Sequence, residues 1–189
     1  IAFPLAILLY LTRKNGMYQN RFVNGLLNII INVIRSTPFI IMLVCVMPLT
    51  KVLVGTRIGT KAALVPLTIY IAPYLARLME GALLETKAGI IEAAEAMGAT
   101  PLQIVWHFIL PESLGSLILT ITTGTIGLIG ATAMAGYIGG GGIGNIALTY
   151  GYQQFNNRLM FFTVLILIIV VQLIQNLGTW ASAKIRRAR

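Results

Sequence analysis

Long apolar segments separated by short polar ones dominate the pattern of this chain. A helix needs about 20 mostly apolar residues to cross a lipid bilayer. Four segments come close to that length, at residues 38–54, 62–80, 114–136 and 159–180. Residues 1–12 are also apolar but shorter, and we expect them to be the second half of a crossing whose start is missing. The pattern therefore predicts an all-α integral membrane protein with about five transmembrane helices per chain, the first one truncated.

Residues 21–37, before the first full apolar segment, carry a polar stripe. Asn24, Asn28 and Asn32 recur every four residues, which places them on one face of a helix opposite Ile, Leu and Val. We expect this helix to lie along the membrane interface. The alternative is that it forms the first half of a long, kinked crossing whose Asn stripe faces protein.

Composition and charge agree with a membrane protein. Hydrophobic residues make up 57% of the chain and charged residues 10%, against about 25% charged residues in soluble domains. The net charge of +9 could suggest nucleic acid, but the basic residues flank apolar segments, so we expect lipid and no nucleic acid as partner. All but four of the Lys and Arg residues lie in 13–37, 77–113 and 181–189. The positive-inside rule places these three segments in the cytoplasm, with the N-terminus outside and the C-terminus cytoplasmic.

The acidic residues lie in a single window from Glu80 to Glu112. Within it, residues 89–97 favour a helix, and Gly98 can take the left-handed conformation that ends one. Thr100 then provides an N-cap, with Gln103 three residues later as a capping box requires. A second helix should run from residue 101 to about 109, limited by Pro111. The window thus predicts two short helices joined by a sharp turn between two crossings.

The first of these short helices has the composition of a docking element. Its acidic residues, Glu92 and Glu95, alternate with apolar ones, a pattern that suits a groove on another protein. The alternative is an amphipathic helix on the membrane surface. Anionic lipid headgroups attract basic helices and this one is acidic, so docking on a protein is favoured.

The same stretch resembles the cytoplasmic signature of the membrane subunits of ATP-binding-cassette importers. That signature is E-A-A, three residues, G, nine residues, I, one residue and L-P, and here Phe108 stands at the Ile position. In that family the segment is the coupling helix, which docks into a cleft of the cytoplasmic ATPase. The resemblance implies an ATPase-coupling role within a coupling segment at about 84–112, for Glu92, Ala93, Ala94, Glu95, Met97, Gly98, Leu110 and Pro111.

Three stretches narrow the resemblance to the methionine-import permeases: "IRSTPFIIML", "EAAEAMGATPLQIV" and "GGGGIGNIALTYGY". The resemblance implies a single transmembrane permease domain over residues 1–189, in the inner membrane of a bacterial cell. It implies a homodimer that translocates D- and L-methionine, two cytoplasmic ATPase subunits that bind ATP and Mg²⁺, and an external substrate-binding protein. The chain itself would hold no cofactor or metal and would not be an enzyme.

Two other functions stay open. The chain could be the permease of a related importer for glycine betaine, phosphonate or another amino acid, because those permeases share parts of the Gly-rich stretch. It could also be an ion-driven secondary transporter, which should carry charged residues deep in a crossing. The nearest candidates are Arg77 and Glu80, which share a helix face close to the end of their crossing.

The segment at 114–136 is rich in small and hydroxyl residues. These residues favour close helix packing, with a lining of the substrate pathway as the alternative. The pathway candidates are Thr120, Thr123 and Gly127, and Met134 is a candidate hydrophobic gate. Gly139, Gly141 and Gly144 fit a dinucleotide-binding pattern, but that pattern needs a preceding strand. We therefore expect flexible backbone there and no nucleotide.

Overall fold

The computed structural model describes residues 1–14 and 16–187. The regular secondary structure of these residues is helical. The main helices are α1 Ala2–Thr12, α2 Arg21–Ser36, α3 Phe39–Val54, α4 Thr60–Leu84, α5 Ala88–Ala96, α6 Pro101–Ile104, α7 Leu110–Ala135, α8 Ile143–Asn145 and α9 Asn157–Arg187. Short π-helical stretches follow α6 and α8, at Val105–Ile109 and Ile146–Tyr152. Since no strand occurs in the described residues, the expected all-α class is confirmed.

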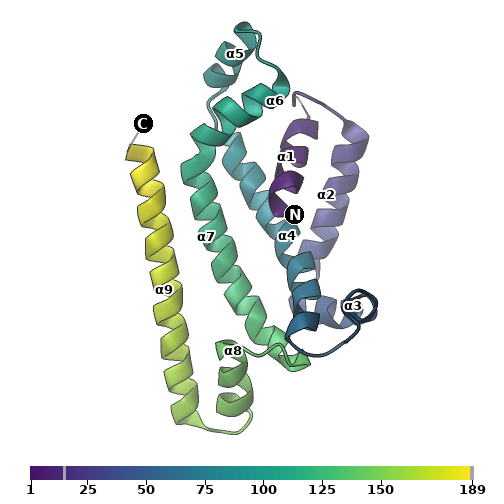
Figure 1. Ribbon diagram of the computed structural model, residues 1–189, viewed down its shortest axis with the longest axis vertical. Helices are drawn as coiled ribbons and strands as arrows, with labels where there is room; N and C mark the ends of the chain where they lie inside the picture. Colours follow the sequence, from purple (N-terminus) through teal and green to yellow (C-terminus); the bar gives the residue numbers. More distant parts are fainter. Residues whose placement is uncertain (15, 188–189) are drawn as a thin grey trace.

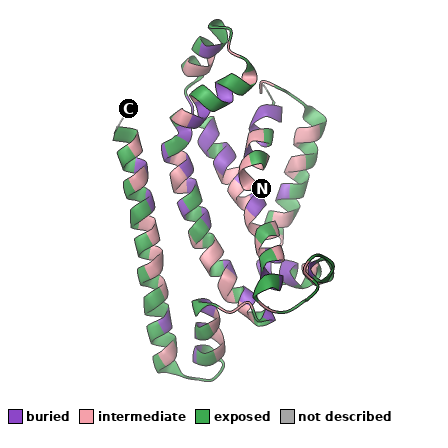
Figure 2. Cartoon of the chain, viewed as in Figure 1, coloured by how far each residue is buried: buried purple, intermediate pink, exposed green. Residues whose placement is uncertain are grey.

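Three long helices, α4, α7 and α9, run lengthwise through the molecule (Figure 1). Within the described residues, three helical stretches are long and apolar enough to cross a membrane: Thr60–Leu84, Pro101–Ile138 and Asn157–Arg187. In their most apolar windows, 44% of the α4 residues are buried but only 6% of those of α9. Figure 2 shows the same contrast, with α9 exposed along most of its length. Apolar α9 therefore keeps a surface that suits lipid or another protein.

Small residues bring the long helices close together. A Cβ atom on Gly124 of α7 would overlap the side chain of Leu75 on α4, and one on Gly178 of α9 would overlap Thr122 of α7. The expectation of close packing in this segment is thus confirmed at Gly124 and Thr122. It does not extend to Gly130, where an added Cβ would meet nothing within 4 Å.

The Asn stripe of the helix at 21–36 faces protein, as the second of the two arrangements predicts. The polar stripe of α2 faces protein, because the Asn24 amide donates to the Leu9 carbonyl at 3.3 Å and to the Thr12 hydroxyl at 3.2 Å. The Asn28 side chain accepts a hydrogen bond from Arg77 of α4. We therefore correct the expected interfacial position: α2 packs along α1 and α4 (Figure 1).

The expected crossing at 38–54 is also corrected. α3 turns by 113° from α2 and is seen nearly end-on in Figure 1, across the direction of the long helices. The break has a local cause, because a residue before proline avoids helical geometry. Thr37 is extended, with ψ 122°, immediately before Pro38. Counted as one broken span, α2 and α3 would make a fourth crossing.

Two apolar clusters hold the bundle, one near each end. The first joins α1, α4, α5, α6 and α7 around buried Leu9, Leu83 and Ile104. The second joins α3 to α4 and α7 around Leu43 and Ala131. The first cluster therefore ties the segment between α4 and α7 to the rest of the bundle.

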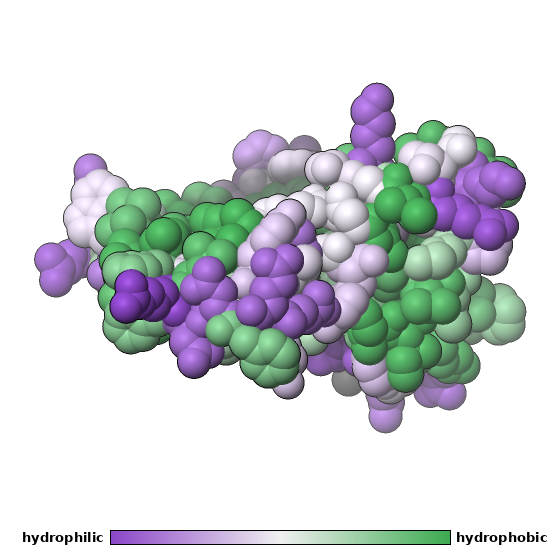
Figure 3. All heavy atoms as spheres, turned by 90° about the horizontal axis from the view of Figure 1, so that it is seen from below, coloured by the Kyte–Doolittle hydropathy of each residue, from purple (hydrophilic) through white to green (hydrophobic). Residues whose placement is uncertain are grey.

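The Gly-rich stretch forms a turn at the far end of the bundle. Gly139, Gly141 and Gly142 have positive φ angles of 73°, 71° and 95°, which other L-residues rarely adopt. The turn leads from α7 into α8, and no strand precedes it in the described chain, so the dinucleotide pattern has no structural basis here. Figure 3, seen from this end, shows hydrophilic residues interspersed with hydrophobic surface.

Candidate functional site

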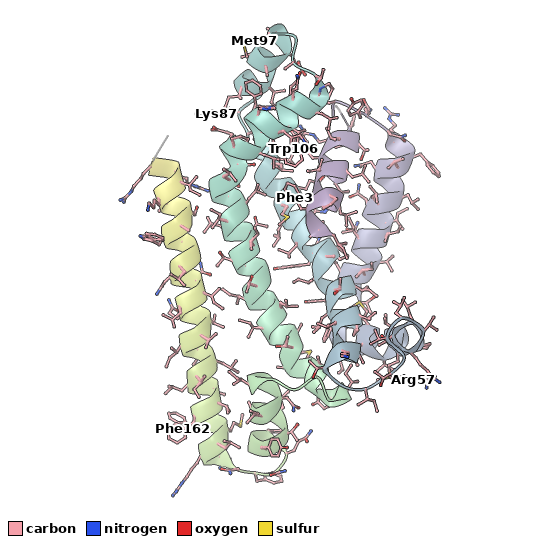
Figure 4. The ribbon with its side chains drawn as sticks, viewed as in Figure 1. Phe3, Arg57, Lys87, Met97, Trp106 and Phe162 are labelled. Atoms are coloured by element: carbon pink, nitrogen blue, oxygen red, sulfur yellow. The ribbon has the colours of Figure 1, made fainter. Side chains whose placement is uncertain are left out.

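The predicted coupling segment, at about 84–112, forms a helical knuckle at one end of the bundle (Figure 1). We call this end of the bundle the coupling end. The knuckle begins after α4, turns back between α5 and α6, and leads into α7. Met97 lies at the tip (Figure 4), with 69% of its surface exposed. The C-terminal end of α9 lies at the same end of the molecule. This is the placement that the alternating crossings predicted.

The turn after α5 is set by its backbone. The Ala99 N–H donates to the Ala94 carbonyl at 3.1 Å, and the Gly98 N–H donates to the Glu95 carbonyl at 2.9 Å. This pair of bonds is the Schellman motif, which needs a left-handed residue after the helix. Gly98 provides it, with φ 77°. The sequence prediction for Gly98 is confirmed.

The predicted capping box at the start of α6 is confirmed too. The Thr100 hydroxyl accepts from the Gln103 N–H, and the Gln103 side chain accepts from the Thr100 N–H at 2.8 Å. Our expectation for Pro111 was wrong, because the helix does not stop there. The π-helical stretch at 105–109 lets the chain continue, and Pro111 enters the first turn of α7, where a missing N–H is tolerated.

The knuckle has an outer face and an inner face. Exposed positions recur at helical spacing on the outer face, which we define as Gly89, Glu92, Ala93, Ala96 and Met97. Ala94 points inward and is fully buried.

The two carboxylates of α5 are not equivalent. Both are exposed, but only Glu95 also lines a small cavity of about 150 Å³, together with Arg13. The structure thus distinguishes, by this cavity, two residues that the sequence pattern treats alike.

The base of the knuckle is packed firmly into the first apolar cluster. Val105 and Ile109 of the π-helical stretch are buried, as is Leu110 at the start of α7. The Trp106 ring lies edge-on to Phe3 of α1, with centroids 6.3 Å apart (Figure 4). The base of the knuckle therefore packs against α1, α4 and α7 within one apolar cluster.

Two of the four pathway candidates lie in a polar cavity between α4, α7 and α9. Thr120 and Thr123 line this cavity of about 380 Å³, which we call the α4–α7–α9 cavity. The structure does not bring Gly127 or Met134 to it. Met134 is 14 residues beyond Thr120 on the same helix, which corresponds to roughly 20 Å.

One polar group in this cavity combines residues from distant parts of the chain. Glu85 follows α4, Ser116 lies on α7 and Arg186 on α9. The Ser116 hydroxyl donates to the Glu85 carboxylate and accepts from the Arg186 guanidinium, the latter at 3.0 Å. Sequence reasoning missed this group, since Ser116 and Arg186 are 70 residues apart and no local pattern links them.

Arg77, which also lines the cavity, is held by a second polar group. Its guanidinium pairs with Glu80 at 2.7 Å and donates to Asn28 of α2. Glu80 is buried, with only 6% of its surface exposed. Arg77 and Glu80, which share a helix face in the sequence, therefore form a salt bridge within α4, and the hydrogen bond from Arg77 to Asn28 joins α4 to α2.

Residues 2–187 match the family described as binding-protein-dependent transport system inner membrane component. The chain belongs to that family. A probable D-methionine transport system permease protein MetI from Vibrio cholerae is 44% identical to it, over 99% of this chain and 82% of the relative. The methionine import system permease protein MetP of Bacillus subtilis is 45% identical, over 90% and 77%.

Two solved structures are similar in fold to this chain. A structure described as an inward-facing conformation of the MetNI methionine ABC transporter superimposes on this family member with a TM-score of 0.94 at 45% identity. The superposition covers 98% of this chain and 86% of that one. An amino acid ABC transporter crystallised with histidines has a TM-score of 0.75 at 16% identity, which shows a shared fold only.

Proposed function

We propose that this chain is the permease subunit of an ATP-binding-cassette importer and forms the translocation pathway for D- and L-methionine. One observation carries the proposal: relatives named as methionine permeases are 44% and 45% identical to the chain over nearly its whole length. The superposition on a methionine transporter at a TM-score of 0.94 supports it.

The outer face of the knuckle is the proposed contact for a cytoplasmic ATPase. It combines a carboxylate, Glu92, with small residues and the flexible apolar side chain of Met97, all exposed. Such a helix suits a groove on a partner. Leu110 and Pro111 lie at the base of the knuckle and transmit the contact into α7. ATP and Mg²⁺ bind to the ATPase subunits, and this chain is not itself an enzyme.

The permease works as a homodimer with two ATPase subunits and an external substrate-binding protein. The exposed apolar length of α9 supports a lipid-embedded assembly in the inner membrane. When the ATPases close on ATP, they move the two knuckles, and each first apolar cluster passes that movement to its long helices. The pathway then switches between inward and outward access.

The coupling end faces the cytoplasm in this proposal. Both the knuckle and the C-terminal end of α9 lie there (Figure 1), which supports a cytoplasmic C-terminus. α1 also ends on this side, near the knuckle, which supports an N-terminus on the external side of the membrane.

A charge on the tip of the knuckle tests the docking proposal. Met97→Lys should reduce co-purification of the ATPase with the detergent-solubilised permease by about tenfold or more, the effect of losing one central interface residue. Gln153→Lys adds the same charge to an exposed residue before α9 and should leave co-purification unchanged. Wild-type yield of the ATPase with Met97→Lys would remove the docking surface from this face.

Uptake into proteoliposomes tests which substrate the permease transports. The assembled transporter with its binding protein should accumulate D- and L-methionine only when ATP is supplied. Glycine betaine should not compete with methionine. Uptake that follows an ion gradient without ATP, or that prefers glycine betaine, would contradict the proposal.

A further inference from the structure

The α4–α7–α9 cavity has the properties of a ligand site. Its volume of about 380 Å³ falls in the range of small-molecule pockets, roughly 300–1,000 Å³. Apolar walls come from Leu78, Ala82 and Leu119. Charged and hydroxyl groups converge on the same space, and such a combination is typical of binding sites.

The cavity contains a negative and a positive side chain, Glu85 and Arg186, that are held apart. Glu85 and Arg186 do not pair directly in the described structure, and the Ser116 hydroxyl bridges them. A carboxylate accepts several hydrogen bonds and a guanidinium offers five donors, so both keep capacity for a ligand. Arg77 adds a positive group that Glu80 already balances. The cavity is therefore close to neutral as a whole but polar from one side to the other.

We propose that the α4–α7–α9 cavity binds the zwitterionic head group of an amino acid on its way through the permease. The ammonium group would bind to Glu85 and the carboxylate to Arg186. The apolar walls would take the unbranched side chain. This inference rests on the proposed function, because it assigns the methionine pathway to a place in the chain.

Two threonines make the test specific. Thr123 lines the cavity, whereas Thr125 on the same helix does not. Both are exposed, and both hydroxyls donate to the carbonyl four residues earlier at 2.9 Å. Cysteines at these positions, in a Cys45→Ala background, are therefore matched probes.

Maleimide labelling is measured in inside-out vesicles that contain the full chain and its ATPase. L-Methionine should slow labelling of Thr123→Cys and leave that of Thr125→Cys unchanged. N-acetylmethionine lacks the ammonium group and methionine methyl ester lacks the carboxylate. Each should need about 10- to 100-fold higher concentration for the same protection, the effect of one lost charge-assisted hydrogen bond.

Charge variants assign the two ends of the ligand. Glu85→Gln should weaken protection by methionine about 10- to 100-fold but leave protection by N-acetylmethionine unchanged. Arg186→Gln should weaken protection by methionine to the same extent but leave protection by methionine methyl ester unchanged. Arg187→Gln, the neighbouring exposed arginine outside the cavity, is the control and should change neither.

The outcomes separate this inference from the proposed function. If wild-type vesicles take up methionine but methionine protects neither cysteine, the site is overturned and the function stands. If Glu85→Gln weakens protection by both ligands equally, Glu85 is a structural tie between helices and the assignment is also overturned. If uptake fails but methionine still protects Thr123→Cys selectively, the site stands and the function does not.

Discussion

At the scale of single residues, Gly98 controls the shape of the knuckle. It has φ 77°, and an added Cβ would meet nothing within 4 Å. The constraint is therefore on the backbone and not on space. Left-handed geometry costs most L-residues about 1–2 kcal/mol, and Asn tolerates it better than most.

The effect of a substitution at Gly98 should depend on how readily the new residue adopts the left-handed conformation. Gly98→Val should strongly reduce ATP-dependent uptake, because it shifts the turn that presents the outer face, whereas Gly98→Asn should retain more. Gly98→Asp also adds a charge and should cripple uptake while membrane insertion stays intact. Gly25→Ala is the control, since it adds a methyl group to open space within helical α2, away from the knuckle. Equal uptake by Gly98→Val and the wild type would contradict this role of the turn.

Arg77 is the second residue with a sharp expectation. Arg77→Met removes the partner of buried Glu80 and should lower the free energy of unfolding by about 3 kcal/mol, the cost of an unpaired buried charge. Replacing both as Arg77→Met with Glu80→Met should recover much of that loss. Thermal unfolding of the purified permease in detergent measures both variants. A double variant less stable than Arg77→Met would argue against the ion pair as the cause.

At the scale of the elements, glycines decide how closely the long helices approach. A Cβ on Gly178 would overlap Thr122, including the Thr122 Cβ at 2.8 Å, which is fixed to the backbone of α7. The α7–α9 contact therefore depends on this glycine. Gly130 in α7 has no such neighbour within 4 Å.

Replacing Gly178 or Gly130 by alanine should have different effects on stability. Gly178→Ala should destabilise the permease by about 1–3 kcal/mol, as overpacking does. Gly130→Ala should be neutral or stabilising, because alanine favours the helix. Thermal unfolding in detergent compares the two, and a loss of stability at Gly130 equal to that at Gly178 would contradict the packing argument.

At the scale of the whole molecule, the two ends of the bundle differ in role. The coupling end holds the knuckle, the α4–α7–α9 cavity and the C-terminal end of α9. The opposite end holds the Gly-rich turn and the loop before α9. In the proposed orientation, the first end is cytoplasmic and the second external.

Labelling of single cysteines tests this orientation. In a Cys45→Ala background, Gln153→Cys should react with a membrane-impermeant maleimide on intact spheroplasts. Lys14→Cys should react only after the membrane is permeabilised, because Lys14 lies near the coupling end of α1. The reverse result would place Glu92 outside the cell and remove the proposed ATPase contact.

The sequence alone determined the class of protein, the positions of α4, α7 and α9, and the turn at 97–103. These features are local: apolar length selects membrane helices, while Gly98, Thr100 and Gln103 set caps with their immediate neighbours. The knuckle as a candidate docking site followed from the same local signals.

Only the tertiary structure decided which long-range neighbours these elements have. It turned α3 away from α2, packed the Asn24 and Asn28 side chains on α1 and α4, and placed Glu95 but not Glu92 at a cavity beside Arg13. It also brought Glu85 and Arg186 to the hydroxyl of Ser116. Such contacts depend on how helices far apart in the chain pack, and side-chain spacing within one segment does not encode that packing.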